Sequence, residues 1–167
     1  MLKSLTLRSS SGWRRLRWHR RMPSGAFGKP VGWSRADDIR KLVRPPVFPG
    51  RIFPIAEYGA KGDGVTLNTQ AIARAIEACT AAGGGRALVE AGRFLMGAIN
   101  LKSNVELHLA RGPTLLFSTD TRNYPVVHTR WEGVDVMGYS PLIYAYRQKN
   151  IAVTGSGTID GQASDRF

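Results

Sequence analysis

A short stretch near the end of the chain constrains the fold more than any other feature of the sequence. Residues 150–161 read Asn-Ile-Ala-Val-Thr-Gly-Ser-Gly-Thr-Ile-Asp-Gly, with alternating branched residues and with glycines where the backbone must turn a corner. Residues 104–107, Asn-Val-Glu-Leu, begin in the same way. This recurrence is typical of a parallel β-helix, in which an asparagine at a corner can hydrogen-bond to its counterpart in the next coil. We therefore expect the two segments to be successive rungs around one apolar axis.

Other short apolar runs share this pattern. The sequence predicts strands at residues 55–58, 86–89, 94–96, 98–99, 104–109 and 114–117, with turns at 91–92 and 112–113. In residues 104–109 the valine and both leucines point to one face, and Glu106 and His108 to the other. Strands this short, without helices between them, favour a solenoid over a doubly wound sheet. Residues 118–141 follow no such pattern, and we expect them to be irregular.

One helix is predicted ahead of the series. Its apolar residues recur at offsets of three, four and seven, as on one face of a helix: Ile72, Ala75, Ile76 and Cys79. Asn68 is suited to cap the first turn through its side-chain oxygen, and the three glycines at 83–85 end the helix. A stacked-repeat protein needs such a cap because its terminal repeat otherwise exposes core side chains. Cys79 is expected to be a buried, inert thiol on this helix.

The glycine-rich residues 59–64, Gly-Ala-Lys-Gly-Asp-Gly, precede this helix. A phosphate-binding loop of the Walker type requires Lys and Ser or Thr directly after its last glycine, whereas Val65 follows Gly64. We therefore interpret the segment as a backbone corner, in which Asp63 accepts hydrogen bonds from nearby amides.

The positive charge of the chain is concentrated at its N-terminus. The formal net charge is +12, and residues 1–50 hold 12 Lys and Arg against only Asp37 and Asp38. Residues 51–167 hold the other 12 against 10 acidic residues. The basic character thus belongs to the beginning of the chain and does not indicate a nucleic-acid-binding domain.

Residues 13–21 of this basic region mix arginines with two tryptophans. Three interpretations compete: a disordered extension, contact with anionic lipid or nucleic acid, and a targeting signal. A secretory signal needs about 7–15 apolar residues after its positive start, and none follow. Low apolar content and like-charge repulsion favour the disordered extension. We expect residues 1–33 to be a basic, disordered tail and residues 34–167 to be the folded domain. No membrane span is expected, because no run approaches about 18 apolar residues.

Four segments together resemble the N-terminal part of the polygalacturonase family of glycoside hydrolases, which cut pectin. They are residues 58–66, 129–133, 139–145 and 150–161, and the resemblance runs from about Asp37 to Gly161. It implies an all-β, right-handed parallel β-helix, capped at its N-terminal end by one amphipathic helix and incomplete at its C-terminal end. Pectic polysaccharide or oligogalacturonide is the implied ligand. The family suggests a secreted or periplasmic protein, but no signal peptide is recognisable, so the localisation stays open.

The resemblance also implies hydrolysis with inversion by paired aspartates, an acid and a base about 6.5–9.5 Å apart. The family carries this chemistry in the motifs Asn-Thr-Asp, Asp-Asp, Gly-His-Gly and Arg-Ile-Lys. Three are absent, and the one Asp-Asp, Asp37-Asp38, lies upstream of the predicted β-helix. No catalytic residue can be assigned, and we expect the chain alone to be inactive. Whether it is a natural fragment, a frameshift or an incomplete gene is left open.

With roughly 20–30 residues to a coil, residues 86–161 hold only about three coils. The last coil is expected to expose an unpaired strand edge, which favours aggregation or self-association through the open end of the β-helix.

The best candidates for substrate contact are Arg130, Trp131 and Glu132. Arginine can bind a uronate carboxylate with two hydrogen bonds, a tryptophan face can stack on a sugar ring, and Glu132 can accept from hydroxyl groups. The alternative is that Trp131 packs under a loop while the two charges form a solvated pair. Neither a metal site nor a cofactor is indicated, because His108 and His128 lack ligand spacing. Asp160 is interpreted as a turn residue.

Two other functions stay open. The chain can be a non-catalytic carbohydrate-binding or structural β-helix protein, or it can belong with other β-helix proteins such as pectate lyases and phage tailspikes.

Overall fold

The computed structural model describes residues 33–164. The chain divides into two units, Met1–Arg44 and Pro45–Phe167. In the first unit, the described residues form η1 (Trp33–Arg35) and the short helix α1 (Ala36–Leu42), which has no buried residue. Asp37 and Asp38 lie in the first turn of α1. The expected tail lies outside the described residues except for Trp33, and the domain boundary after residue 33 stays a prediction.

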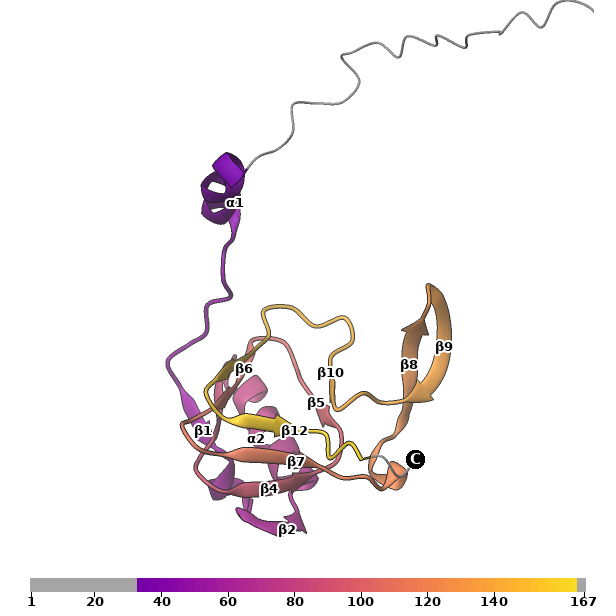
Figure 1. Ribbon diagram of the computed structural model, residues 1–167. Helices are drawn as coiled ribbons and strands as arrows, with labels where there is room; N and C mark the ends of the chain where they lie inside the picture. The colour runs from indigo at the N-terminus through magenta and orange to yellow at the C-terminus, as the bar shows by residue number, and fades with distance from the viewer. Residues whose placement is uncertain (1–32, 165–167) are drawn as a thin grey trace, which may run out of the picture. The chain divides into compact units, whose positions relative to one another are not determined.

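The second unit is a parallel β-helix built from three parallel sheets (Figure 1). The first sheet has the order β1 (Ile52–Pro54), β3 (Gly85–Val89), β6 (Val105–Leu109), β11 (Ala152–Gly155). The second has the order β12 (Thr158–Asp160), β7 (Thr114–Phe117), β4 (Arg93–Met96), β2 (Asp63–Leu67). The third pairs β10 (Ile143–Tyr144) with β5 (Ile99–Asn100). Successive coils are thus β3-β4-β5, β6-β7-β10 and β11-β12, which confirms the predicted fold class.

The two segments with a leading asparagine are adjacent rungs, as expected. Strand β11 pairs in parallel with β6, with Ala152 opposite Glu106 and Gly155 opposite Leu109. At the corner before them, the Asn150 Nδ2 atom donates to the Asn104 Oδ1 atom at 3.1 Å. Both asparagines have left-handed backbones, with φ of 53° and 64°. Asparagine adopts this conformation more readily than most residues because its short polar side chain bonds locally.

The core lies between the sheets and under helix α2 (Thr69–Ala81). The predicted apolar face of the helix is buried, including Cys79, which is a free thiol. The helix packs against β1, β3 and the 3₁₀ helix η2 (Ile55–Tyr58), and so covers the first coil. The predicted cap is confirmed. The same core cluster includes apolar side chains of the β-helix: Val89, Phe94, Met96, Val105, Leu107, Leu115 and Phe117.

Asn68 does not cap this helix in the way predicted. The helix begins directly after it, but its side chain makes no capping hydrogen bond. Its Oδ1 atom instead accepts from the Lys61 amide at 2.7 Å, and its Nδ2 atom donates to the carbonyls of Lys61 and Thr66. The side chain is fully buried and joins both ends of the glycine-rich corner. Its oxygen is therefore engaged by the incoming chain and cannot reach the helix amides.

The strand predicted at residues 55–58 is also wrong, since these residues form the 3₁₀ helix η2. Gly59 adopts a left-handed φ of 89°, and the amides of Gly59 and Ala60 bond back to the carbonyls of Ala56 and Ile55. These backward bonds close a helical turn and prevent the extended conformation. The strands instead lie on either side of it, in β1 and β2.

Residues 118–141, which were expected to be irregular, contain regular structure. They form the 3₁₀ helix η3 (Thr121–Asn123) and an antiparallel hairpin of β8 (Val126–Trp131) and β9 (Val134–Tyr139). The hairpin is inserted between β7 and β10 and projects from the β-helix (Figure 1). This insertion lengthens one coil, so β6 and β11 lie farther apart in the sequence than β3 and β6, although they are neighbours in the sheet.

Candidate functional site

The hairpin contains the three residues predicted to bind substrate. Its strands pair from Val126 opposite Tyr139 to Trp131 opposite Val134, which leaves Glu132 and Gly133 as a two-residue turn. Both turn residues have positive φ, 47° and 89°. This is the conformation of a type I′ turn, whose twist matches that of the paired strands. Glu132 and Gly133 belong to the segment 129–133 that resembles polygalacturonases, and the requirements of this turn alone explain them.

Arg130 and Trp131 lie on opposite faces of this hairpin. They are consecutive in β8, and successive side chains of a strand point to opposite sides. Arg130 lies opposite Asp135 across the strands, whereas Trp131 lies opposite Val134. One sugar ring therefore cannot lie flat on Trp131 while its carboxylate binds Arg130 on the same face. Contact with both requires a ligand that passes over the tip, beside Glu132.

The alternative in which Trp131 packs beneath a loop is wrong. Its side chain is 71% exposed. Arg130 and Glu132 form no ion pair with each other, because the ion pairs of the described residues involve other side chains. The tip thus presents an uncovered indole and an unpaired guanidinium to solvent.

A second group of side chains meets the hairpin partway along β8. The rings of His128 and Tyr146 lie 5.4 Å apart at an angle of 57°. The Arg147 guanidinium lies 5.2 Å from the centre of the Tyr146 ring. The Tyr144 hydroxyl donates to the His128 carbonyl at 2.8 Å, which joins β10 to the hairpin. Sequence reasoning missed Tyr146 and Arg147, because no local pattern indicates that the chain returns past His128 after the insertion.

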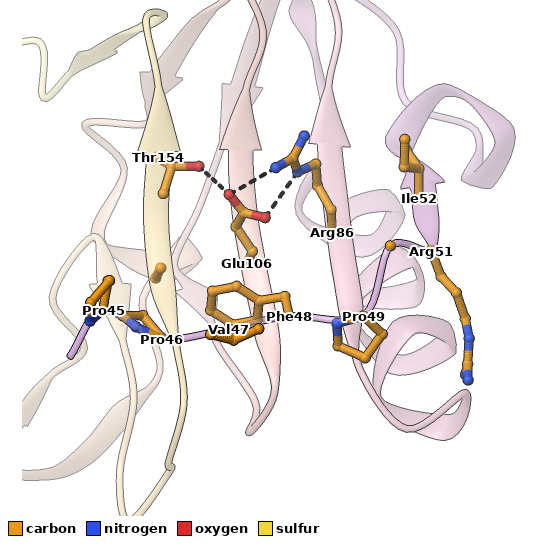
Figure 2. Close-up of a pocket in the computed structure, with 12 residues that line it drawn as sticks. Pro45, Pro46, Val47, Phe48, Pro49, Arg51, Ile52, Arg86, Glu106 and Thr154 are labelled. Carbon is orange, nitrogen blue, oxygen red and sulfur yellow. Dashed lines mark hydrogen bonds and ion pairs between the residues drawn. The ribbon is translucent and has the colours of Figure 1, made fainter.

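A separate cavity of about 500 Å³ lies on the outer face of the first sheet (Figure 2). Residues 45–50, which we call the lead-in segment because they run into β1, cross β11, β6 and β3 and form one wall with three prolines and Phe48. The other wall includes Arg86, Glu106 and Thr154, one from each of these strands. The Val47 carbonyl accepts from Asn150 Nδ2 at 2.9 Å, so the segment is attached to the asparagine corner.

The polar side chains on the strand side of this cavity, Arg86, Glu106 and Thr154, are paired with one another. Arg86 donates to both carboxylate oxygens of Glu106, at 2.9 and 3.3 Å, and the Thr154 hydroxyl donates to Glu106 Oε1 at 2.6 Å. His108 Nδ1 lies 2.7 Å from the Thr154 hydroxyl oxygen. Burial by itself raises the pKa of Glu106, but the hydrogen bonds and positive charge of its partners outweigh it and lower that pKa. Because Arg86 and Thr154 already bind the Glu106 carboxylate, we interpret these side chains as a structural link between neighbouring coils.

The chain was compared with family models, with curated proteins and with solved structures. No family model matches the chain. An exo-poly-alpha-D-galacturonosidase of Dickeya chrysanthemi is 40% identical over 124 residues, 70% of this chain and 20% of its own length. The crystal structure of an exopolygalacturonase from Thermotoga maritima matches 78% of this chain and 29% of its own, with 45% identity and a TM-score of 0.73. This chain is polygalacturonase-like. A mannuronan C5-epimerase of Azotobacter vinelandii is also 41% identical over 122 residues, but only over 7% of its length.

The polygalacturonase-like chain thus spans about a fifth to three tenths of the length of the polygalacturonases it matches. Its adjacent aspartates, Asp37 and Asp38, lie exposed on α1, where they pair with Arg40 and Lys41. Asp160 accepts from the Gln162 amide at 2.8 Å, the geometry of a turn residue. Within residues 33–164, no group of His, Cys, Asp and Glu side chains is arranged to hold a metal ion. No helix in the same range is long and apolar enough to cross a membrane.

Proposed function

We propose that this chain is part of a pectin-cleaving glycoside hydrolase and supplies the capped first coils of its β-helix. The observation that carries the proposal is that polygalacturonases match this chain over 70% of its length in sequence and 78% in structure. Hydrolysis in this family requires paired carboxylates about 6.5–9.5 Å apart, with a water between the base and the sugar. The motifs that supply them are not among the 167 residues, so the proposed role of this part is to hold and bind, without cleaving.

The purified chain should therefore release no reducing ends from polygalacturonate under conditions in which an intact polygalacturonase does. The physical reason is that removing both the acid and the base leaves no group to protonate the leaving oxygen or to activate water. A reducing-sugar assay measures this directly. Release of galacturonate or oligogalacturonides by the purified chain, above a heat-inactivated control, would contradict the proposal.

The proposed substrate contact is the hairpin tip, with Arg130, Trp131 and Glu132. Exposure of the indole supports it, as does the absence of an ion pair at Arg130 among the residues that the structure describes. Because Arg130 and Trp131 face opposite sides, we propose that a pectic polymer crosses the tip and meets them in turn. Arg130→Ala and Trp131→Ala should then each weaken binding of long oligogalacturonides.

The exposed hairpin also favours a second candidate, a non-catalytic carbohydrate-binding β-helix protein. Such a protein needs the hairpin but needs no catalytic carboxylates. The coding sequence beyond codon 167, read in all three frames, distinguishes the two. Finding Asn-Thr-Asp, Asp-Asp, Gly-His-Gly and Arg-Ile-Lys there supports the hydrolase, and their absence supports a binding protein.

A further inference from the structure

We propose that one face of the hairpin, together with the segment that follows β10, is a binding site for the carboxylates of an acidic oligosaccharide built from uronic acids. The site consists of His128, Arg130, Tyr146 and Arg147, and we name it the cationic face. It extends the proposed function by locating where the acid groups of the sugar bind, and it rests on that function for the class of ligand.

Strand geometry places Arg130 on the same side as the ring cluster. His128 and Arg130 are two residues apart in β8, and such residues point to the same face about 6–7 Å apart. His128 contacts the Tyr146 ring, and Arg147 lies over that same ring. The two guanidiniums therefore flank an exposed histidine–tyrosine pair. The hydrogen bond from the Tyr144 hydroxyl to the His128 carbonyl attaches β10 to this part of the hairpin.

Within the part of the chain that the structure describes, the two arginines of the cationic face form no ion pair. Among the described residues, the ion pairs and side-chain hydrogen bonds of arginine involve residues 40, 74, 86 and 122, and neither Arg130 nor Arg147. This contrasts with Arg86, whose guanidinium is used by Glu106. One carboxylate, Asp135, lies on the same hairpin face opposite Arg130 and makes no ion pair in the described residues. It reduces the attraction for an anion without neutralising both arginines.

The backbone at Arg147 adds an independent reason to assign it a role. Its φ of 54° lies in the left-handed region, which a residue with a Cβ atom adopts less readily than glycine does. The guanidinium of this residue lies over the Tyr146 ring. Glycine would suit this turn better for stability, so a conformational argument alone does not account for arginine.

The chemistry of the four residues fits a uronic acid. Arginine binds a carboxylate with two parallel hydrogen bonds, and a tyrosine ring presents a flat apolar surface for the C–H face of a sugar. A phosphate would satisfy the arginines equally, but it would make no use of the exposed ring. Trp131, on the opposite face, does not belong to this site.

The experiment titrates the full chain with trigalacturonate while arginine Nε–H signals are followed by NMR and affinity is measured by calorimetry. A short ligand is used because the basic residues 1–50 attract any long polyanion. Arg130→Gln, Arg147→Gln and Arg147→Gly should each raise Kd about two- to fivefold, as expected for exposed charge contacts. Asp135→Asn should lower Kd. Arg111→Gln is the matched control, because it removes one exposed arginine from the turn between β6 and β7 and should leave Kd unchanged.

Two further arms test the chemistry. Fully methyl-esterified trigalacturonate keeps the rings but loses the carboxylates, and it should bind more weakly than the acid. Arg147→Gly should weaken binding without lowering the melting temperature, which separates loss of the site from loss of the fold.

The outcomes separate this inference from the proposed function. Binding that resists every cationic-face substitution but weakens with Trp131→Ala overturns the cationic face and leaves the pectic ligand in place. If Arg111→Gln weakens trigalacturonate binding as much as the cationic-face substitutions do, the ligand is attracted by general positive charge, and the cationic face is overturned. Binding of inorganic phosphate as tight as that of trigalacturonate has the same consequence. If trigalacturonate does not bind at all, both the cationic face and the binding role fail. Release of reducing ends contradicts the proposed inactivity alone.

Discussion

At the scale of single residues, Asp63 fixes the corner before the cap helix. Its carboxylate accepts from the amides of Val65 and Thr66 and from the Thr66 hydroxyl. The Thr66 side-chain hydrogen bond is the largest cause that lowers the pKa of Asp63 to about 2. A carboxylate with a depressed folded pKa stabilises the fold above its unfolded pKa, about 3.9, and loses this contribution as the pH falls through its folded value.

Asp63→Asn should therefore lower the melting temperature at pH 7, and the difference from the native chain should disappear between about pH 4 and pH 2. The effect should be small, because the carboxyl group is exposed to solvent. Thermal unfolding at several pH values measures it. Glu57→Gln, at an exposed carboxyl without a hydrogen bond or ion pair in the described structure, is the control. A difference for Asp63→Asn that grows on acidification would contradict the assignment.

At the scale of elements, the asparagine corner joins two coils and the lead-in segment. Asn150 donates to Asn104 and to the Val47 carbonyl while it adopts a left-handed backbone. Asn150→Ala loses both bonds and adds backbone strain, so it should destabilise the fold by about 2 kcal/mol. Asn150→Gly loses the same bonds but relieves the strain, and it should cost less. Urea unfolding measures both, and an equal or larger cost for glycine would show that backbone conformation does not matter here.

At the scale of the whole β-helix, the last coil presents strand edges without a neighbour among the described residues. Val153 and Ile159 continue the core-facing rows of Leu107 and Leu115, yet they are 42% and 44% exposed. Apolar rows at an open edge favour pairing with another chain.

We therefore expect the purified chain to self-associate with increasing concentration, as measured by sedimentation velocity. Val153→Lys with Ile159→Lys should suppress the association, because burying two charges in an interface is costly. Thr158→Lys, on the adjacent outward position, is the matched control and should leave it intact. A chain that stays monomeric over the accessible concentrations would contradict the expected self-association.

Much of the β-helix could be predicted because its signals are local. The alternation of Val105, Leu107 and Leu109 marks a strand with one buried face, and the offsets of Ile72, Ala75 and Ile76 mark a helix face. The hairpin could not be predicted in the same way. Its two strands have one fully exposed face, so their apolar residues follow no clear period, and Val126, Met137 and Tyr139 are all exposed.

The candidate site was predictable only in part. The Arg-Trp-Glu-Gly motif located the hairpin tip, and strand alternation then placed Arg130 and Trp131 on opposite sides. Tyr146 and Arg147 lie far from Arg130 in sequence and reach the same surface through the return of the chain into β10. Glu106, read as an outward strand residue, is nearly buried beneath the lead-in segment.

The sequence alone determined the strands at residues 86–89, 94–96, 104–109 and 114–117, because side-chain periodicity and corner residues act over a few positions. It determined the helix that covers the first coil for the same reason. The tertiary structure decided which residues from different coils meet: Arg86 with Glu106 and Thr154, and His128 with Tyr146. Such contacts depend on the register in which coils stack and on the point where an insertion rejoins them, and no local pattern encodes either.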